Sequence, residues 1–510
     1  MRALFCIPPP AYNARGRSID RVYGCNYGFD YKPPVHLLAV ATYARDVLGW
    51  EVRLLDCPAE GIDQDTFEGQ IVPEGWDVVA SWSTYLSAIE DVAAARLFHA
   101  ARPQTRFVFM GAGATWRPEE FQVGDHSVVL MGEPEHSLRA VAESWAEGRS
   151  LEGTPGVAWF GADGTCHRGG FRDLLDVSEL PMPDRRLLKG RYRANRLERG
   201  PITVLAVSRG CGFRCTFCTT NAMDQAVDLE FKRRLADGGH RYEKRAPLRK
   251  RTPEQVVAEL RDIAALGYKG VEIADNIFTW GKQRTLEICR GIEDLDLDWI
   301  CLARAGMLHD PEVVGAMKRA GCKLVYMGSE SFDDGLLDDM IKQQRVADVE
   351  RAVRTCRSVG LEPEVSVLIG ASPKEDWGTL WRSWRASRRL GTRFVHFSVA
   401  LPAPSTEMYD QALEHGWFIE GDFRPADNQR EVIVNLPNLS RRELQAMLKM
   451  AYAAQYLSPA GIWEQARRVR SVDDLLHKAR AAGALFRFLG QRPEPARAVI
   501  PAGRVTPLHP

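Results

Sequence analysis

The sequence predicts an α/β fold built from two consecutive strand–helix arrays. The first is an N-terminal doubly wound parallel sheet of Rossmann-like type; the second is a partial (β/α)6 barrel, which a C-terminal helical region follows. Three observations lead to this prediction. The chain has 510 residues, too many for one typical hydrophobic core. Short apolar runs alternate with helical patterns over residues 1–150 and again over 201–435. After residue 436 the strand pattern disappears.

The first array contains five buried-strand candidates and two well-marked helices. The strands are expected in MRALFCIP, WEVRLLDC, WDVVASWS, RFVFMGAG and SVVLMGEP, and the helices in VHLLAVATYARDVLG and AIEDVAAARLFHAARP. Ligands of parallel sheets bind at the carboxyl ends of the strands. Glycine there would let a bulky flat ligand approach the backbone, although glycine also commonly ends strands. These ends are Pro8–Pro10, Asp56–Gly61, Ser81–Thr84, Gly111–Thr115 and Gly132–Glu135.

The remainder of the chain divides into three parts. Residues 151–200 combine a short β-like stretch with the loop LPMPDRR and are expected to be a linker. From 201 to 435, six strand–helix steps predict a barrel-like array, whose chemistry would lie at the strand carboxyl ends. One of its helices begins with a capping box at Thr252. Residues 436–510 are expected to be helical, beginning at a Ser440 N-cap.

Composition excludes several classes of protein. Lys+Arg and Asp+Glu balance at 67 each, so a nucleic-acid partner is not favoured. No apolar run approaches the roughly 20 residues that span a bilayer, and the N-terminal run is expected to be a buried strand rather than a signal peptide. Eleven scattered cysteines do not resemble a secreted disulfide scaffold. A cytoplasmic location is therefore expected.

Three cysteines crowd into the loop after the first barrel strand, as Cys211-x3-Cys215-x2-Cys218. Structural zinc usually has four ligands, and His240 could be proposed as the fourth. Thiolates also hold iron–sulfur clusters, and a [4Fe–4S] cluster on three cysteines would keep one iron open for a ligand. The remaining alternative is three unrelated cysteines near a strand end.

This spacing resembles that of the radical S-adenosylmethionine (SAM) superfamily, and the resemblance extends over nearly the whole chain. The barrel segments that carry it are DNIFTW at 275–280, MGSES at 327–331, VLIGASPKED at 367–376 and LPAPSTEMY at 401–409. The N-terminal part resembles the cobalamin-binding domain of one subgroup through IPPP, YGCNYGFDYKPP, LLDCPAEG, MGAGAT and MGEPE. That subgroup includes the anaerobic magnesium-protoporphyrin ester cyclase and many methyltransferases.

One departure concerns the cobalt ligand. Cobalamin domains of methionine-synthase type carry Asp-x-His-x-x-Gly, whereas this chain has Pro58 at the histidine position, within Asp56–Gly61. The subgroup commonly lacks this histidine too. The resemblance therefore still implies cobalamin, with its lower cobalt face open or capped by water or another side chain.

The resemblance also implies which residues bind the cofactors. Cys211, Cys215 and Cys218 would hold the [4Fe–4S] cluster, and SAM would chelate the open iron. The candidates for SAM binding are Phe217, Asp275, Arg304, Glu330 and Ser331. Of these, Glu330 and Arg304 could instead form an ion pair with each other. The candidates for cobalamin binding are Pro9, Cys57, Glu60, Ser83, Thr84, Gly111, Gly113, Gly132 and Glu133.

Three functions stay open at this point. The first is methyl transfer from SAM via methylcobalamin to a poorly activated carbon of a small-molecule intermediate. The second is a cyclase or oxidoreductase of the protoporphyrin ester type. The third is a structural protein that holds zinc or a cluster without catalysis. The first two imply a small-molecule substrate and a reductase, flavodoxin or ferredoxin as electron donor.

Some further residues have a possible role without a clear partner. An aromatic stretch could cap a flat corrin or substrate, or simply cover the sheet edge. The basic run at 243–251 could meet an anionic substrate or be a solvated loop. His396, in an apolar strand, could be a hydrogen-bonded core residue or a catalytic candidate. The aromatic residues are Tyr23, Tyr27, Phe29 and Tyr31, and the other unassigned histidines are His36 and His415.

Overall fold

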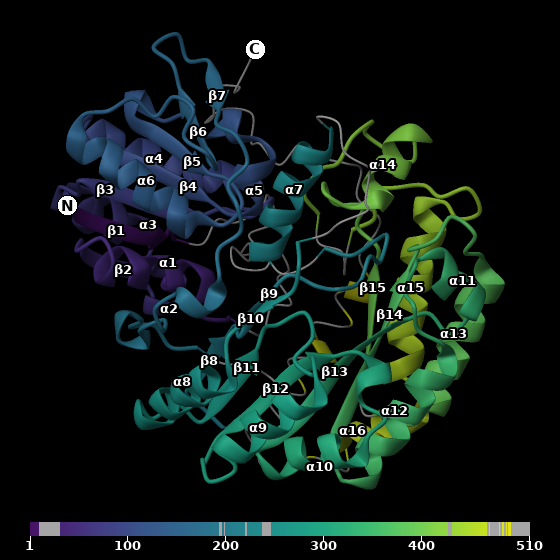
Figure 1. Ribbon diagram of the computed structural model, residues 1–510. Helices are drawn as coiled ribbons and strands as arrows, with labels where there is room; N and C mark the ends of the chain where they lie inside the picture. The colour runs from purple at the N-terminus through teal and green to yellow at the C-terminus, as the bar shows by residue number, and fades with distance from the viewer. Residues whose placement is uncertain are drawn as a thin grey trace.

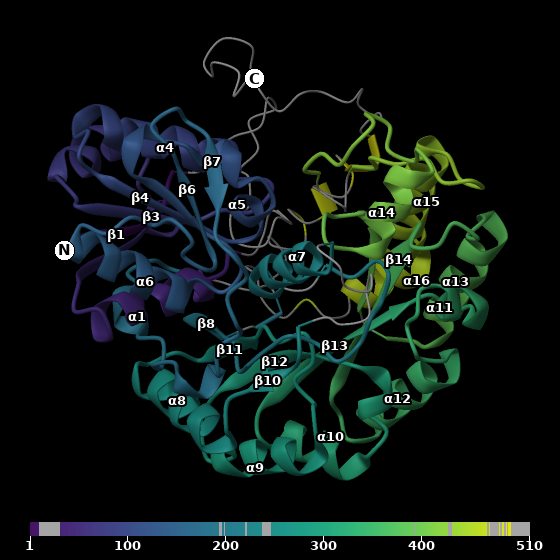
Figure 2. The same cartoon turned by 45° about the horizontal axis from the view of Figure 1, so that its top comes forward.

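The fold consists of two sheets with their helices, joined by α7 (Ala222–Ala236), which lies between the two domains (Figures 1 and 2). The computed structural model describes residues 1–9, 31–192, 196–197, 199–219, 222–236, 246–392, 394–426 and 431–466, with a few positions beyond 466. Among these residues, no helix is both long and apolar enough to cross a bilayer.

The N-terminal sheet has seven strands in the order β2-β1-β3-β4-β5-β6-β7. The first five pair in parallel, and β6 and β7 add antiparallel edges. These last two strands lie in the stretch for which the sequence predicts a linker. The strands are β1 (Arg2–Ile7), β2 (Glu51–Asp56), β3 (Val78–Trp82), β4 (Arg106–Met110), β5 (Ser127–Leu130), β6 (Val157–Phe160) and β7 (Cys166–Arg168).

Helices cover both faces of this sheet, as a doubly wound fold requires. Leu38 of α1 (Val35–Asp46) and Leu138 of α6 (Pro134–Glu147) pack in a cluster on one face. Phe98 of α4 (Ala88–Ala101) packs in the cluster on the other. The predicted α/β class of this domain is confirmed. Two short helices follow its strand ends, α2 (Cys57–Glu60) and α5 (Ala112–Trp116).

The second sheet has six parallel strands in the order β15-β14-β13-β12-β11-β8, so the predicted partial barrel is confirmed. Alternation sets the two faces: Val325 and Met327 pack in the core under the outer helices, and Tyr326 lies on the inner face. The strands are β8 (Ile202–Leu205), β11 (Gly270–Ile273), β12 (Asp298–Ala303), β13 (Cys322–Glu330), β14 (Glu362–Ile369) and β15 (Phe394–Val399).

The barrel helices follow their strands in chain order and cover the outer face (Figure 2). The capping boxes at Thr252 and Ser440 form as the sequence predicts. A separate two-stranded ribbon, β9 (Ser208–Arg209) with β10 (Arg249–Lys250), lies beside the cysteine loop. The helices are α8 (Pro253–Ala265), α9 (Lys282–Ile292), α10 (Pro311–Arg319), α11 (Asp334–Asp339), α12 (Val346–Ser358), α13 (Trp377–Arg389), α14 (Glu407–Glu414), α15 (Arg441–Tyr456) and α16 (Pro459–Ala466).

Candidate cluster and cofactor site

The cysteine loop begins where β8 ends, and buried carboxylates fix its first residues. Asp275, just after β11, accepts hydrogen bonds from the backbone N–H groups of Val207 (2.7 Å) and Ser208 (3.1 Å) and from the Ser208 hydroxyl (2.6 Å). Burial raises the pKa of Asp275 to about 6, against the effect of these hydrogen bonds. Asp275 therefore holds the approach to the cysteines through the backbone.

A second carboxylate fixes the turn into the motif. Gly210 has φ +87°, and a Cβ there would lie 2.4 Å from the carbonyl oxygen of Pro247, so the position requires glycine. Its N–H donates to Asp224 of α7 (2.8 Å), which also accepts from Asn276 (2.7 Å). Helix α7 is thus tied to the residue directly before Cys211.

The three thiols lie in a loop that a backbone hydrogen bond ties to the end of α11. Cys215 is buried, and Cys211 and Cys218 are partly exposed. The N–H of Thr216 donates to the carbonyl of Met340 (3.1 Å). In the described part of the chain, no three Cys, His, Asp or Glu side chains are spaced to hold a single metal ion. His240, the fourth ligand that the zinc alternative needs, lies outside the described residues.

An aromatic and cationic stack covers the first half of the loop. The rings of Phe213 and Trp280 stack at 5.3 Å, and the Arg304 guanidinium lies 3.7 Å from the Phe213 ring centroid. A Cβ on Gly212 would lie 2.9 Å from the Trp280 ring, so glycine lets the loop pass beneath it. Nη2 of Arg304 is buried and has no hydrogen-bond partner among the described residues. Arg304 thus has donor capacity to spare beside the cysteines.

Glu330 forms an ion pair, but with a residue that the sequence analysis missed. The Lys342 ammonium donates to Glu330 at 2.6 Å, so the suggested pair with Arg304 is wrong. Burial lowers the pKa of Lys342, but the charges of Glu330 and Cys215 and the hydrogen bond to Glu330 together raise that pKa above its ordinary value. Lys342 also lies 5.7 Å from the ring of Phe217. No local pattern marks Lys342, because helix α11 separates it from β13.

The backbone around this pair is strained. Glu330 has φ +63°, and Ile341 and Gln343, on either side of Lys342, have φ +50° and +51°. Left-handed backbone in residues other than glycine is costly and gathers at functional sites. Ser331 faces the other way: its hydroxyl lies 3.2 Å from that of Ser383 in α13. Its suggested role in SAM binding stays a prediction.

At the carboxyl edge of the N-terminal sheet, two glycines let the backbone of one loop pass close to that of the next. A Cβ on Gly111 would lie 2.7 Å from the Ser83 carbonyl oxygen, and one on Gly113 would lie 2.5 Å from that of Thr84. Trp82 Nε1 and the hydroxyls of Ser81 and Ser83 are buried and have no hydrogen-bond partner in the described structure. These orphaned polar atoms fit a polar ligand at this edge. The glycines, in contrast, pack the β4–α5 turn against the end of β3.

The loop at Asp56 is already occupied by protein groups. Asp56 accepts hydrogen bonds from the hydroxyls of Tyr31 (2.8 Å) and Tyr192 (2.9 Å), whose rings stack at 6.1 Å. Burial raises the pKa of Asp56 to about 6. Glu60 accepts from the N–H of Asp56, and Cys57 lies in the apolar core. Cys57 therefore does not face an open edge, and one carboxylate oxygen of the half-buried Glu60 is already bonded within the loop.

Gly132 and Glu133 lie at the interface between the domains. A Cβ on Gly132 would lie 3.4 Å from Glu230 and 4.0 Å from Val227, both in α7. Glu133 pairs with Arg209 and Arg249 of the ribbon. Burial would raise the pKa of Glu133, but these two arginines lower it. Pro9, the last cobalamin candidate, is buried at the end of the β1 segment.

The remaining candidates contact other protein groups, are buried, or lie outside the described residues. Arg249 and Arg251, in the predicted basic run, pair with Glu133 and Glu259, whereas Lys250 between them is exposed. Residues 243–245 lie outside the described residues. Tyr23, Tyr27 and Phe29 lie outside the described residues. Nε2 of His36 is buried and has no hydrogen-bond partner among the residues that the structure describes. Burial lowers the pKa of His36 and His396 to about 3, and the ring of His415 lies 5.4 Å from that of Trp417.

Comparison with known proteins identifies this arrangement. Residues 205–384, from the end of β8 into α13, match the model of the radical SAM superfamily. These residues therefore form a radical SAM domain. Over 468 residues the chain is 26% identical to an uncharacterized methyltransferase of Pyrococcus horikoshii, in an alignment that covers 90% of this chain and 93% of the relative.

Two more comparisons concern the fold of the whole chain and the class of reaction. The fold of the chain matches that of the radical SAM methyltransferase TsrM of Kitasatospora setae, solved with cobalamin and a [4Fe–4S] cluster, at a TM-score of 0.66 and 17% identity over 95% of this chain and 100% of TsrM. The anaerobic magnesium-protoporphyrin IX monomethyl ester cyclase of Rubrivivax gelatinosus is 23% identical over 40% of this chain and 34% of the cyclase. The family prediction is confirmed, and a methyltransferase is favoured over a cyclase.

Proposed function

We propose that this chain is a cobalamin-dependent radical SAM methyltransferase that moves a methyl group from SAM to a poorly activated carbon of a small-molecule intermediate. The observation that carries the proposal is that one buried network joins the three-cysteine loop to the carboxyl edge of the N-terminal sheet. When bound, the cluster would supply an electron to SAM, and cobalamin would carry the methyl group. The protein would orient and shield both.

The cluster would be held by Cys211, Cys215 and Cys218. Asp224 and Asp275 fix the backbone of residues 207–210 and so hold the loop before any cluster binds. Carboxylates that accept backbone N–H bonds are strong local restraints. The stack over the loop would limit access of water to its first half.

SAM would lie between the loop and the ends of β12 and β13. Its carboxylate would find a cation in Arg304, which has a spare donor, or in Lys342. Its amino group would find an acceptor in Glu330, whose oxygens accept from Lys342 at 2.6 Å and from Ser366 at 3.3 Å. Phe217, beside Lys342, would contact the apolar part of the cofactor. Asp275 would act through the loop rather than by direct contact.

Cobalamin would lie at the carboxyl edge of the N-terminal sheet. Ser83, Ser81 and Trp82 offer buried polar atoms there that have no hydrogen-bond partner within the described ranges. The sequence has Pro58 where a cobalt-ligating histidine would stand, and Asp56 beside it is already bonded to two tyrosines. This loop therefore offers no imidazole to the lower face of cobalt.

A small-molecule substrate and a one-electron donor, such as a flavodoxin or ferredoxin, complete the proposed reaction. The cyclase alternative rests on similarity that covers less than half of either chain. Methyl transfer would have a distinct product set, because the SAM that supplies the methyl group would leave S-adenosylhomocysteine and the SAM that supplies the radical would leave 5′-deoxyadenosine.

The test is anaerobic reconstitution of the full chain with iron, sulfide and hydroxocobalamin. We expect about four irons per chain, a corrin absorption band, and S-adenosylhomocysteine beside 5′-deoxyadenosine after reduction with SAM and substrate. Cys218→Ala should lose the cluster, whereas Cys166→Ala, on distant β7, should keep it. A chain that cleaves SAM and converts its substrate without forming S-adenosylhomocysteine would exclude methyl transfer and support the cyclase.

A further inference from the structure

Two arginines at facing positions of the β9–β10 ribbon contact one turn of the N-terminal domain. Arg209 and Arg249 are Cα partners in this antiparallel pair. Both side chains reach the Glu133-Pro134-Glu135 turn, where β5 gives way to α6. The ribbon belongs to the barrel half of the chain, so these contacts cross the domain boundary.

The contacts form a charge-balanced network of two arginines and two glutamates. Arg209 donates to Glu135 from two nitrogens, at 2.6 and 3.2 Å, and to Glu133 at 3.4 Å. Arg249 donates to Glu133 at 2.8 Å and to the carbonyl of Leu175 at 3.0 Å. The exposed fractions of these side chains are 11% for Arg209, 14% for Arg249, 6% for Glu133 and 1% for Glu135.

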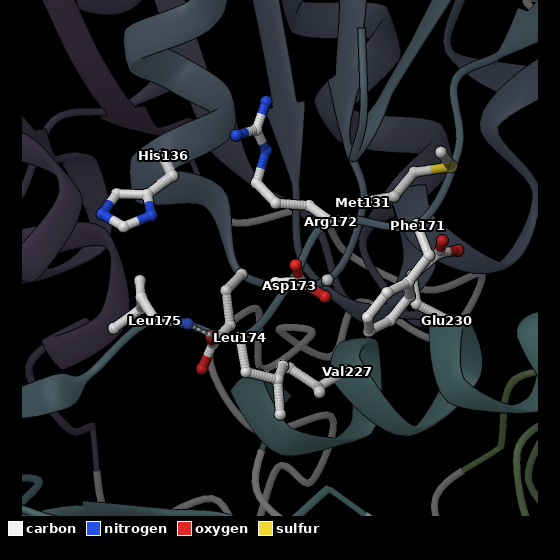
Figure 3. A pocket seen from close by; sticks show the side chains of 11 residues that line it. Met131, His136, Phe171, Arg172, Asp173, Leu174, Leu175, Val227 and Glu230 are labelled. Carbon is white, nitrogen blue, oxygen red and sulfur yellow. Dashed lines mark hydrogen bonds between the residues drawn. The ribbon is translucent and has the colours of Figure 1, made fainter. Parts of the chain in front are cut away.

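The Glu133–Glu135 turn is also held by a hydrogen bond that does not involve the ribbon. The N–H of Leu175 donates to Glu133 at 3.2 Å, the dashed bond in Figure 3. The same view shows Val227 and Glu230 of α7 on one side of the cleft and His136 of α6 on the other. Glu133 is therefore fixed by its own domain as well as by the ribbon.

The network links the cysteine loop to the carboxyl edge of the N-terminal sheet, and its residues lie close in sequence to one or the other. Arg209 precedes Cys211 by two residues, and Gly210 between them is bonded to Asp224. Glu133 lies three residues beyond the end of β5, at the carboxyl edge proposed for cobalamin. Any rotation of one domain against the other must break or carry along these bonds.

We propose that Arg209 and Arg249 are positioning residues, which fix the distance between the cluster and cobalamin by clamping the cysteine loop to the Glu133–Glu135 turn. This inference rests on the proposed function. Four buried charges cost more desolvation than an apolar contact of the same size, so adhesion alone does not explain them. Two-nitrogen contact between arginine and carboxylate adds a direction that an apolar contact lacks.

The rest of the interface supplies a matched contrast. Arg117 also crosses the boundary, to Asp422 at 3.3 Å, but their side chains are 38% and 45% exposed. Solvent weakens such a pair. Arg117 is therefore the control position for a residue that bridges the domains without fixing the cofactors.

Pulsed EPR measures the distance directly, because cob(II)alamin and the reduced cluster each carry an unpaired spin. The experiment uses the full chain, reconstituted with both cofactors and reduced. We expect one narrow distance for the wild type and for Arg117→Met. Arg209→Met and Glu135→Gln should lose that single distance and give a broad distribution, while iron and corrin contents stay unchanged.

The possible outcomes separate this inference from the proposed function. A wild-type chain that binds no cluster or no corrin would overturn both. A narrow wild-type distance that Arg209→Met and Glu135→Gln both retain would overturn the inference alone. If Arg209→Met fails to fold, by circular dichroism, the milder Glu135→Gln decides, since it keeps the side-chain volume and one acceptor oxygen.

Discussion

Removing the Asp275 carboxylate should loosen the cysteine loop at its base. Asp275→Ala leaves the backbone N–H groups of Val207 and Ser208 buried without their acceptor. An unsatisfied buried donor costs about 1–3 kcal/mol, so two of them should lower the free energy of unfolding by about 2–6 kcal/mol. The lost bonds lie within four residues of Cys211, so the variant should also retain less iron after reconstitution.

Asp275→Asn is the matched variant, because its amide oxygen still accepts from both backbone groups. The Ser208 hydroxyl can rotate to accept from the new amide, so we expect a change within about 1 kcal/mol. Urea unfolding of the apoprotein at pH 8, followed by circular dichroism, measures both variants. Asp294→Ala, which removes an exposed ion pair with Arg261, controls for a surface carboxylate.

Two results would refute this reasoning. An Asp275→Ala chain as stable as the wild type would mean that water replaces the carboxylate at no cost. Equal losses in Asp275→Ala and Asp275→Asn would mean that the negative charge, rather than the accepted hydrogen bonds, supports the loop. Normal iron content in a destabilised Asp275→Ala chain would separate the stability of the barrel from the geometry of the cysteines.

Three other predictions follow from the same region. Gly212→Ala places a Cβ 2.9 Å from the Trp280 ring and should cost about 1–3 kcal/mol in stability; Trp280→Leu in the same chain should recover part of it, and purely additive losses in urea would argue against the clash. Lys342→Met leaves Glu330 buried without its cation and should cost about 3–5 kcal/mol; the double variant with Glu330→Gln should recover most of this loss, and calorimetry should find SAM binding weakened in both chains. Burial raises the folded-state pKa of Asp275 from 3.8 to about 6, so protonation of this carboxyl stabilises the fold fully below pH 3.8, and this contribution is lost as the pH rises through 6. The free energy of unfolding of the wild type minus that of Asp275→Asn, measured in urea from pH 4 to 7, should therefore decrease with rising pH. A difference that stays constant would contradict the pKa shift.

Local patterns in the sequence were sufficient for the parallel strands of both sheets and the position of the cysteine loop, but not for the antiparallel edge strands β6 and β7. Buried parallel strands are continuous apolar runs, and helices carry their own caps, as at Thr252 and Ser440. Each signal lies within a few residues of the element that it predicts. The same holds for Cys211, Cys215 and Cys218, because one short loop contains the whole motif.

The partners of the site residues were not readable in this way. Lys342 reaches Glu330 only because α11 turns the chain back over the end of β13. Arg209 and Glu133 are 76 residues apart, and neither has a neighbour in sequence that marks the other. Buried ion pairs depend on packing geometry to within about an ångström, and no periodicity encodes such distances.

The sequence by itself therefore determined the chemistry available to this protein: three thiols in one loop, on a (β/α) array behind a second parallel sheet. Tertiary structure decided how that chemistry is held. It assigned Glu133 to the domain boundary rather than to an open edge, and Gly111 and Gly113 to close backbone packing. The physical reason is that a motif is local in the chain, whereas the restraint on it comes from charges and backbone groups that only folding brings together.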